Sequence, residues 1–122
     1  ILNVAEKQRE PIALFPEAIG HGKLIRPPAA VGAFLLLLSE HGLPMLPVGI
    51  YEDDGVLSAR FGEPFFVDVR GIGKEKRAEA ARDQVMVAIG RLLPPHLWGA
   101  YSAEVAQEIG PLPGERPHGG LP

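Results

Sequence analysis

A carboxylate and two cations lie within a few positions of one another in residues 13–28, ALFPEAIGHGKLIRPP. Glu17 follows a short apolar run, and Lys23 and Arg26 come after it in a glycine-containing segment. Open α/β sheets bind their ligands just beyond the carboxyl ends of parallel strands. Glu17 is therefore a candidate ligand-binding carboxylate, and Lys23 and Arg26 make the loop that follows it basic. A brace between Glu17 and nearby backbone amides explains the same carboxylate equally well.

The strand that must position Glu17 is predicted at residues 12–15, with Pro11 at its entry. A proline is tolerated at the first position of a strand, and Pro16 cannot extend the hydrogen-bond ladder. Residues 29–42, AAVGAFLLLLSEHG, are apolar on every side for most of their length and predict a buried helix. Residues 45–51, MLPVGIY, predict a second strand. A strand–helix–strand unit of this kind is expected to be parallel and right-handed.

The middle of the chain predicts a hairpin followed by a long helix. Asp54 and Gly55 are typical of a tight turn that returns residues 56–61 antiparallel to the preceding strand. Residues 74–93 carry apolar side chains at steps of three and four, the spacing of an amphipathic helix. The predicted fold class is therefore α/β, with a mostly parallel sheet, one antiparallel hairpin and flanking helices.

The C-terminal part of the chain is rich in proline and glycine. Trp98 and Tyr101 are expected to pin it to the core, and a short helix is predicted near residues 104–109. The expected organisation is one α/β unit over residues 1–93, followed by a separate segment over residues 94–122.

Composition limits the classes of function. The 122 residues, 46% hydrophobic and 22% charged, suit one globular domain, and the net charge of −3 gives no electrostatic case for binding nucleic acid. There is no cysteine, and the four histidines are scattered, so no metal site or cofactor is expected. The longest apolar stretch is about half of the roughly 20 residues that a membrane-spanning helix needs. Because the chain starts at Ile1 rather than Met, we expect a fragment or a processed piece.

Three short blocks occur in a defined order: Phe15-Pro16-Glu17, then LPMLPV at residues 43–48, then ARFGEPF at residues 59–65. Together they resemble the glycerophospholipid and lysophospholipid acyltransferase family, which includes the 1-acylglycerol-3-phosphate acyltransferases. The resemblance is good over residues 12–66 and faint as far as residue 93. It implies the C-terminal half of an αβα domain, located either in the cytoplasm or peripherally at the inner face of the membrane. The implied reaction moves an acyl group from acyl-carrier protein or coenzyme A to a lysophospholipid or glycerol-phosphate acceptor.

The family's catalytic motif, a His and an Asp separated by four residues, is absent. The residues five positions after His21, His41 and His96 are Arg26, Leu46 and Tyr101. We therefore expect no catalytic residue in this chain, which alone should be inactive. The resemblance and the loop chemistry instead give a set of substrate-binding candidates: Phe15, Pro16, Glu17, Lys23, Arg26, Met45, Leu46 and Pro47.

The expected partners are the lipid acceptor, the acyl donor and either the missing N-terminal half or a second copy of the chain. Phe15, Met45 and Leu46 can border an acyl chain, although core packing is the favoured interpretation of all three. The alternative function is a non-catalytic α/β interaction module that retains the scaffold. If a missing N-terminal half normally covers the helix and the sheet, the isolated chain should leave an apolar surface uncovered, whereas a chain that closes its own core would favour the interaction module.

Overall fold

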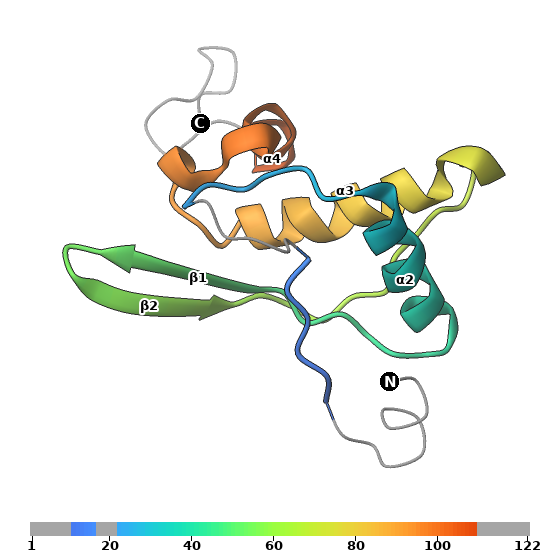
Figure 1. Cartoon of the computed structure of the whole chain (residues 1–122), viewed down its shortest axis with the longest axis horizontal. Coiled ribbons are helices and arrows are strands. Elements are labelled where there is room, and N and C mark those ends of the chain that lie inside the picture. Colours follow the sequence, from blue (N-terminus) through green and yellow to red (C-terminus); the bar gives the residue numbers. More distant parts are fainter. Residues whose placement is uncertain (1–10, 17–21, 110–122) are drawn as a thin grey trace, which may run out of the picture.

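Three α-helices and one two-stranded antiparallel sheet make up the part of the chain that the computed structural model describes, residues 11–16 and 22–109 (Figure 1). The protein is mixed α/β, as predicted. In chain order the elements are α2 (Ala29–Glu40), β1 (Val48–Asp53), β2 (Val56–Phe61), the 3₁₀ turn η1 (Lys74–Lys76), α3 (Arg77–Gly90), the 3₁₀ turns η2 (Pro95–Leu97) and η3 (Gly99–Tyr101), and α4 (Ser102–Ile109). No helix within these residues is long and apolar enough to cross a membrane.

Helix α2 is placed by a close approach to α3. Pro28 directly precedes its first turn, where a missing N–H is tolerated. Gly32 lies against the backbone of Ala78, so a Cβ at this position would overlap the Ala78 carbonyl. The expectation that α2 is buried on every side is wrong, because its buried positions are Gly32, Leu35, Leu38 and Ser39, which lie on one face, while Leu37 is exposed.

The hairpin forms as predicted, although β1 begins at Val48 rather than at Met45. Asp54 and Gly55 make the turn with positive φ values of 50° and 77°, the conformation of a tight hairpin connection. Val48 pairs with Phe61 and Asp53 with Val56. Pro47 has no N–H to donate, which delays the start of the regular ladder.

The predicted strand at residues 12–15 is wrong. These residues form no strand, and Phe15 is 77% exposed. Prolines at both ends of so short a run leave few donors for a ladder. The only sheet among the described residues is the hairpin, so the mostly parallel sheet is not present in this part of the chain.

The core joins the C-terminal segment to the rest of the molecule. Trp98 and Tyr101 are buried, as predicted, and Trp98 donates its indole N–H to the Leu93 carbonyl at 3.0 Å. They pack in one cluster with Leu24, Met86, Leu93 and Val105. Residues 94–109 are therefore part of the same core as residues 24–93.

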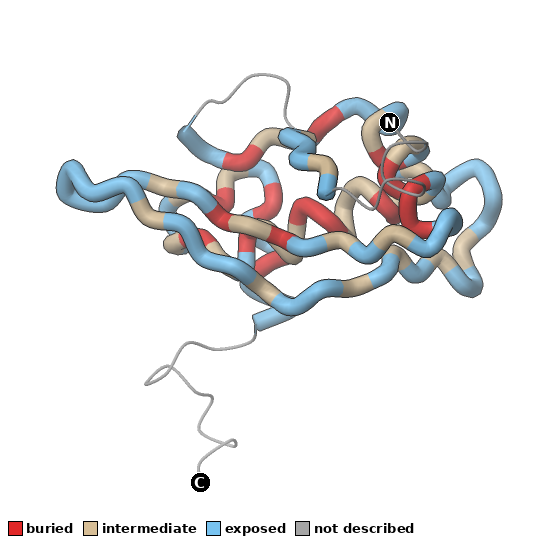
Figure 2. Tube along the Cα trace, turned by 90° about the horizontal axis from the view of Figure 1, so that it is seen from below, coloured by how far each residue is buried: buried red, intermediate tan, exposed pale blue. Residues whose placement is uncertain are grey.

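The two faces of the hairpin differ in character. Gly49 and Tyr51 face inward, since a Cβ on Gly49 would meet Leu92 and Tyr51 packs against the core. Because side chains alternate along a strand, the opposite face carries Val48, Ile50, Glu52, Leu57, Ala59 and Phe61. We call this set the outer hairpin face. The hairpin lies beneath α3 in Figure 1 and in front of the helices in Figure 2, which is seen from below.

Candidate functional site

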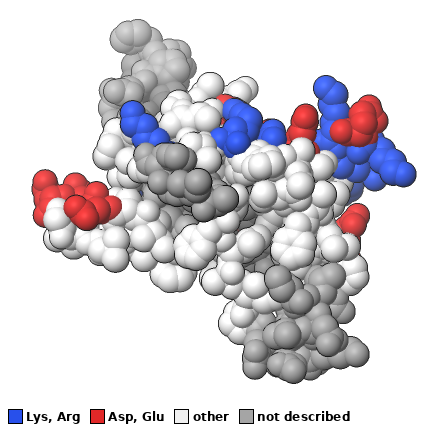
Figure 3. All heavy atoms as spheres, viewed as in Figure 1, with Lys and Arg blue, Asp and Glu red and all other residues white. Residues whose placement is uncertain are grey.

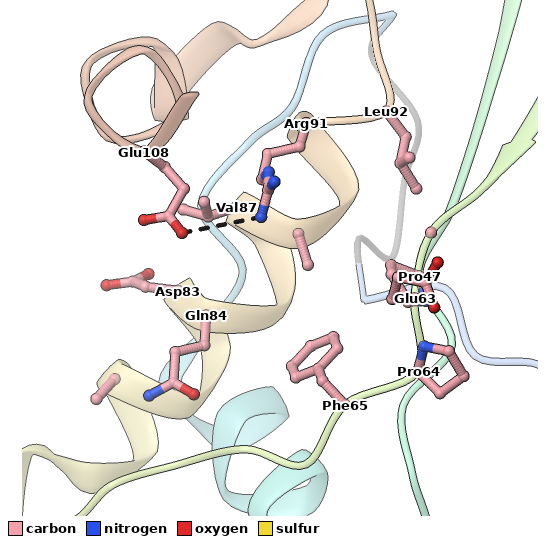
Figure 4. Close-up of a pocket in the computed structure, with 13 residues that line it drawn as sticks. Pro47, Glu63, Pro64, Phe65, Asp83, Gln84, Val87, Arg91, Leu92 and Glu108 are labelled. Atoms are coloured by element: carbon pink, nitrogen blue, oxygen red, sulfur yellow. Dashed lines mark ion pairs between the residues drawn. The ribbon is translucent and has the colours of Figure 1, made fainter. Parts of the chain in front are cut away.

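An open groove of about 670 Å³ separates α3 from the segment that follows β2 (Figure 4). One wall includes Pro47 and residues 62–65, and the other comes from α3 and its C-terminal end. Phe65 points across the groove toward α3, and Leu92 closes one end (Figure 4). Glu108 of α4 lies at the rim.

The first wall is built where two segments continue the hairpin beyond its regular strands. Met45 and Phe65 exchange both backbone hydrogen bonds, at 2.7 and 2.9 Å. The Gly62 N–H donates to the Pro47 carbonyl at 3.0 Å. Residues 43–48 and 59–65, two of the three blocks that resemble the acyltransferases, therefore lie side by side and supply Pro47 and residues 62–65 to this wall.

The groove has an apolar floor and a charged rim. Ala80, Val87 and Ala88 of α3 supply small side chains opposite Phe65. At the rim Arg91 lies 3.8 Å from Glu108, an exposed pair that contributes little to stability. An apolar concave surface with a few polar groups at its edge is typical of sites that hold small organic ligands.

Asp83 connects this groove to a network of charges on the other side of α3. Its Oδ1 accepts hydrogen bonds from the Tyr101 hydroxyl at 2.7 Å, from Arg82 at 2.9 Å and from Arg26 at 3.1 Å. Burial alone would raise the pKa of the Asp83 carboxyl, but the hydrogen bonds from Arg82 and Tyr101 and the two positive charges outweigh it, so the pKa lies below its ordinary value. Burial and the Asp83 carboxylate together raise the pKa of Tyr101.

Arg26 is the centre of the same network. Its guanidinium also donates to Glu104 at 2.7 Å and to the Ala100 carbonyl at 3.0 Å, and it stacks 4.2 Å from the centre of the Tyr101 ring. Arg26 and Arg82 are balanced by Asp83 and Glu104. The network therefore offers little net positive charge to an anion, which favours a structural role for Arg26.

The predicted site residues are distributed over several places. Pro47 is buried in the groove wall, Met45 is half-buried beside Phe65, and Leu46 is 52% exposed. Lys23 is exposed on the loop before α2. The remaining candidates lie near the N-terminus: Phe15 is exposed, Pro16 is half-buried, and Glu17 lies outside the described residues.

The sequence analysis missed the contribution of Asp83, Tyr101 and Glu104. Asp83 occupies a charged position of an amphipathic helix, a pattern that predicts a solvated side chain. Tyr101 was assigned only to the core. The sequence held one signal for this network, the burial expected for Tyr101. A buried phenol hydroxyl needs a hydrogen-bond partner, although the sequence does not say which residue supplies it.

Within the described residues no group of three His, Asp or Glu side chains is placed to hold a metal ion. No protein-family model, curated protein or solved structure matches the chain.

Proposed function

We propose that this chain is the substrate-binding, C-terminal half of a phospholipid acyltransferase. The observation that supports this most is that residues 43–48 and 59–65, which resemble the family in sequence, pair with each other and supply Pro47 and residues 62–65 to one wall of a groove with an apolar floor. The groove would receive the acyl chain, and the loop before α2 would receive the polar head of the acceptor. In the parent protein the hairpin would extend into a mostly parallel sheet with strands of the N-terminal half.

Acyl transfer needs groups that this half does not carry. The acceptor hydroxyl loses its proton to a general base as its oxygen attacks the thioester carbonyl. The new ester C–O bond forms, the C–S bond breaks, and the thiol leaves with a proton. The missing His and Asp would serve as the base and the residue that orients it. The part left to this chain is to hold the reactants in line, which lowers the entropic cost of the reaction.

The individual roles follow from residue chemistry. Pro47, Phe65 and Val87 line the groove and would contact the acyl chain. Glu17 would accept hydrogen bonds from acceptor hydroxyls, and Lys23 would meet a phosphate. The site would work at the cytoplasmic surface of a membrane. On the face drawn in Figure 3, carboxylates gather at the hairpin tip, whereas basic residues lie over the middle of the molecule and, with some acidic ones, at the opposite end.

Binding of a non-hydrolysable thioether analogue of acyl-coenzyme A tests the groove. Ala88→Phe fills the groove from α3, whereas Ala103→Phe adds the same bulk to an exposed position of α4. We expect titration calorimetry to show at least a tenfold loss of affinity for Ala88→Phe, which corresponds to about 1.4 kcal/mol. Ala103→Phe should bind like the wild type. Equal affinities for all three proteins would reject the groove as the acyl site.

Glu17→Gln tests the acceptor role. A lost hydrogen bond to a charged group costs about 1.5–3 kcal/mol, so affinity for a lysophospholipid should fall roughly ten- to a hundredfold. Glu52→Gln, which makes the same change on the hairpin, should have no effect. A lowered melting temperature with unchanged acceptor binding would mean that Glu17 only braces its loop.

The alternative is a non-catalytic interaction module, and the outer hairpin face favours it. Leu57 is 75% exposed and Phe61 is 66% exposed on this face. An apolar surface of this kind is typical of protein contacts. An interaction module would bind neither the thioether analogue nor a lysophospholipid, so the first titration separates the two functions.

A further inference from the structure

The loop before α2 is fastened to the C-terminal segment through its backbone. The Leu24 N–H donates to the Leu97 carbonyl at 2.9 Å, and the Leu24 carbonyl accepts from the Ala100 N–H at 3.0 Å. The Leu24 side chain is 6% exposed, in the core cluster. The backbone N–H, the backbone carbonyl and the side chain of Leu24 are therefore all bound. Leu24, the residue directly after Lys23, is held in place.

Gly99 makes this close approach possible. It has a positive φ of 52°, and a Cβ there would overlap the Leu24 carbonyl oxygen. Only glycine meets both conditions without strain. The C-terminal segment is therefore shaped to accept the loop backbone.

Arg26 fastens the same loop a second time, through its side chain. It reaches Asp83 on α3, Glu104 on α4 and the Ala100 carbonyl on η3. Next to it, Arg82 donates to the Pro27 carbonyl at 3.0 Å. The loop is consequently held from two sides over four successive residues.

We infer that residues 95–104 act as a clamp that positions Lys23 for the phosphate of the acceptor, with Arg26 and Gly99 as positioning residues. This inference rests on the proposed function. The guanidinium of Arg26 is already bound by two carboxylates, whereas Lys23 is exposed beside the anchored Leu24. Fixing the backbone next to Lys23 removes part of the entropy that a flexible loop would lose on binding.

The clamp makes the C-terminal segment part of the acceptor site without any contact to the lipid. A purely structural role would stabilise the fold but would not change which acceptor is preferred. The distinguishing quantity is therefore the ratio of affinities for two lipids that differ only in the phosphate.

The test compares lysophosphatidic acid with the monoacylglycerol of the same acyl chain, both below the concentration at which they form micelles. The wild type should prefer the phosphorylated lipid by about tenfold or more, as expected for one charge-assisted contact. Lys23→Ala should abolish the preference. Arg26→Gln should reduce it several-fold without changing the affinity for monoacylglycerol, and Arg60→Gln on the hairpin should leave it unchanged.

Hydrogen exchange gives an independent readout. The amides of Leu24 and Ala100 should exchange faster in Arg26→Gln while the amide of Met86 stays protected. If Arg26→Gln does not fold, Glu104→Gln removes one contact of the same clamp and should lower the preference in the same direction.

The possible negative results distinguish the positioning of Lys23 from the proposed function. A wild type that binds both lipids equally well leaves the proposed function standing and overturns the positioning of Lys23. Faster exchange at Leu24 with an unchanged preference also overturns it, since the clamp would then be structural only. A wild type that binds neither lipid overturns the proposed function, and the role of Lys23 with it.

Discussion

Replacing Tyr101 with phenylalanine removes one hydroxyl from the charge network and leaves the ring in the core. Tyr101 is fully buried, and its hydroxyl donates to Asp83 at 2.7 Å. A hydrogen bond to a charged group contributes about 1.5–3 kcal/mol to stability. Asp83 keeps two arginine donors, so we expect the lower end of this range. For a domain of roughly this size, 1.5 kcal/mol lowers the melting temperature by about 6–12 °C.

The stability lost in Tyr101→Phe should depend on pH, because both partners of the hydrogen bond have shifted pKa values. The pKa of Tyr101 is raised by burial and by Asp83, so its contribution is fully present below the ordinary tyrosine value of about 10 and is lost as the pH rises above it. The pKa of Asp83 is lowered, so its contribution is present above the ordinary aspartate value of about 4 and is lost as the pH falls below it. The difference between wild type and Tyr101→Phe should therefore be largest at neutral pH and shrink at both extremes.

Thermal denaturation followed by circular dichroism, from about pH 3 to pH 11, measures this difference. Tyr51→Phe is the matched control, because it removes a hydroxyl from a half-buried tyrosine of β1 outside the network. Its melting temperature should stay within about 2 °C of the wild type, as for a change away from buried networks. Equal losses for the two variants, or a Tyr101→Phe deficit that does not change with pH, would refute the network as the source of the stability.

Gly32→Ala should destabilise the protein by about 1–3 kcal/mol, since its methyl group would overlap the Ala78 carbonyl and push α2 from α3. The matched Gly73→Ala meets only a flexible carboxylate and should leave the urea midpoint near wild type, so equal midpoints contradict this packing. The chain should self-associate at micromolar concentration through the outer hairpin face. Leu57→Lys should shift sedimentation toward monomer while the exposed Ala106→Lys does not, and a wild type that is monomeric throughout a dilution series excludes the interface. The chain alone should release no thiol from acyl-coenzyme A in the presence of a lysophospholipid, and release above the buffer rate contradicts the absence of a catalytic base.

Local signals in the sequence were enough to predict most of the elements. Asp54-Gly55 specifies a turn of positive φ by itself, and Pro28 and Gly42 bracket a helix whose interior has no proline. The strand at residues 12–15 failed because a strand also needs a partner. Its composition is suitable for a sheet, but among the described residues no neighbouring strand pairs with it.

The burial of α2 was over-predicted for a related reason. Apolar residues on every side of a helix show which surfaces can be buried, but not which surfaces a neighbour covers. In this chain α3 covers the face of Gly32 and Leu35, and Leu37 stays exposed. Which face of a helix is buried depends on the elements that pack against it. The residue pattern of the helix itself does not contain this information.

The charge network was beyond the reach of sequence patterns. Arg26 lies 57 positions from Asp83 and 78 positions from Glu104, so the three charges meet only after the core has formed. Each one alone looks like an ordinary surface residue. By contrast, the pairing of residues 43–48 with residues 59–65 is a consequence of the hairpin, and a correctly predicted turn already places them side by side.

The groove and the outer hairpin face are both apolar, but they suit different partners. The groove is concave and charged at its rim, whereas the hairpin face ends at an acidic tip that would repel an anionic bilayer. The hairpin face therefore suits a further layer of protein. An acyltransferase half needs both surfaces, and an interaction module needs only the second. Loss of thioether binding in Ala88→Phe with self-association retained is the pattern that acyl transfer requires. An interaction module requires a different pattern. The wild type would bind no lipid but would self-associate, and Leu57→Lys would lose the self-association.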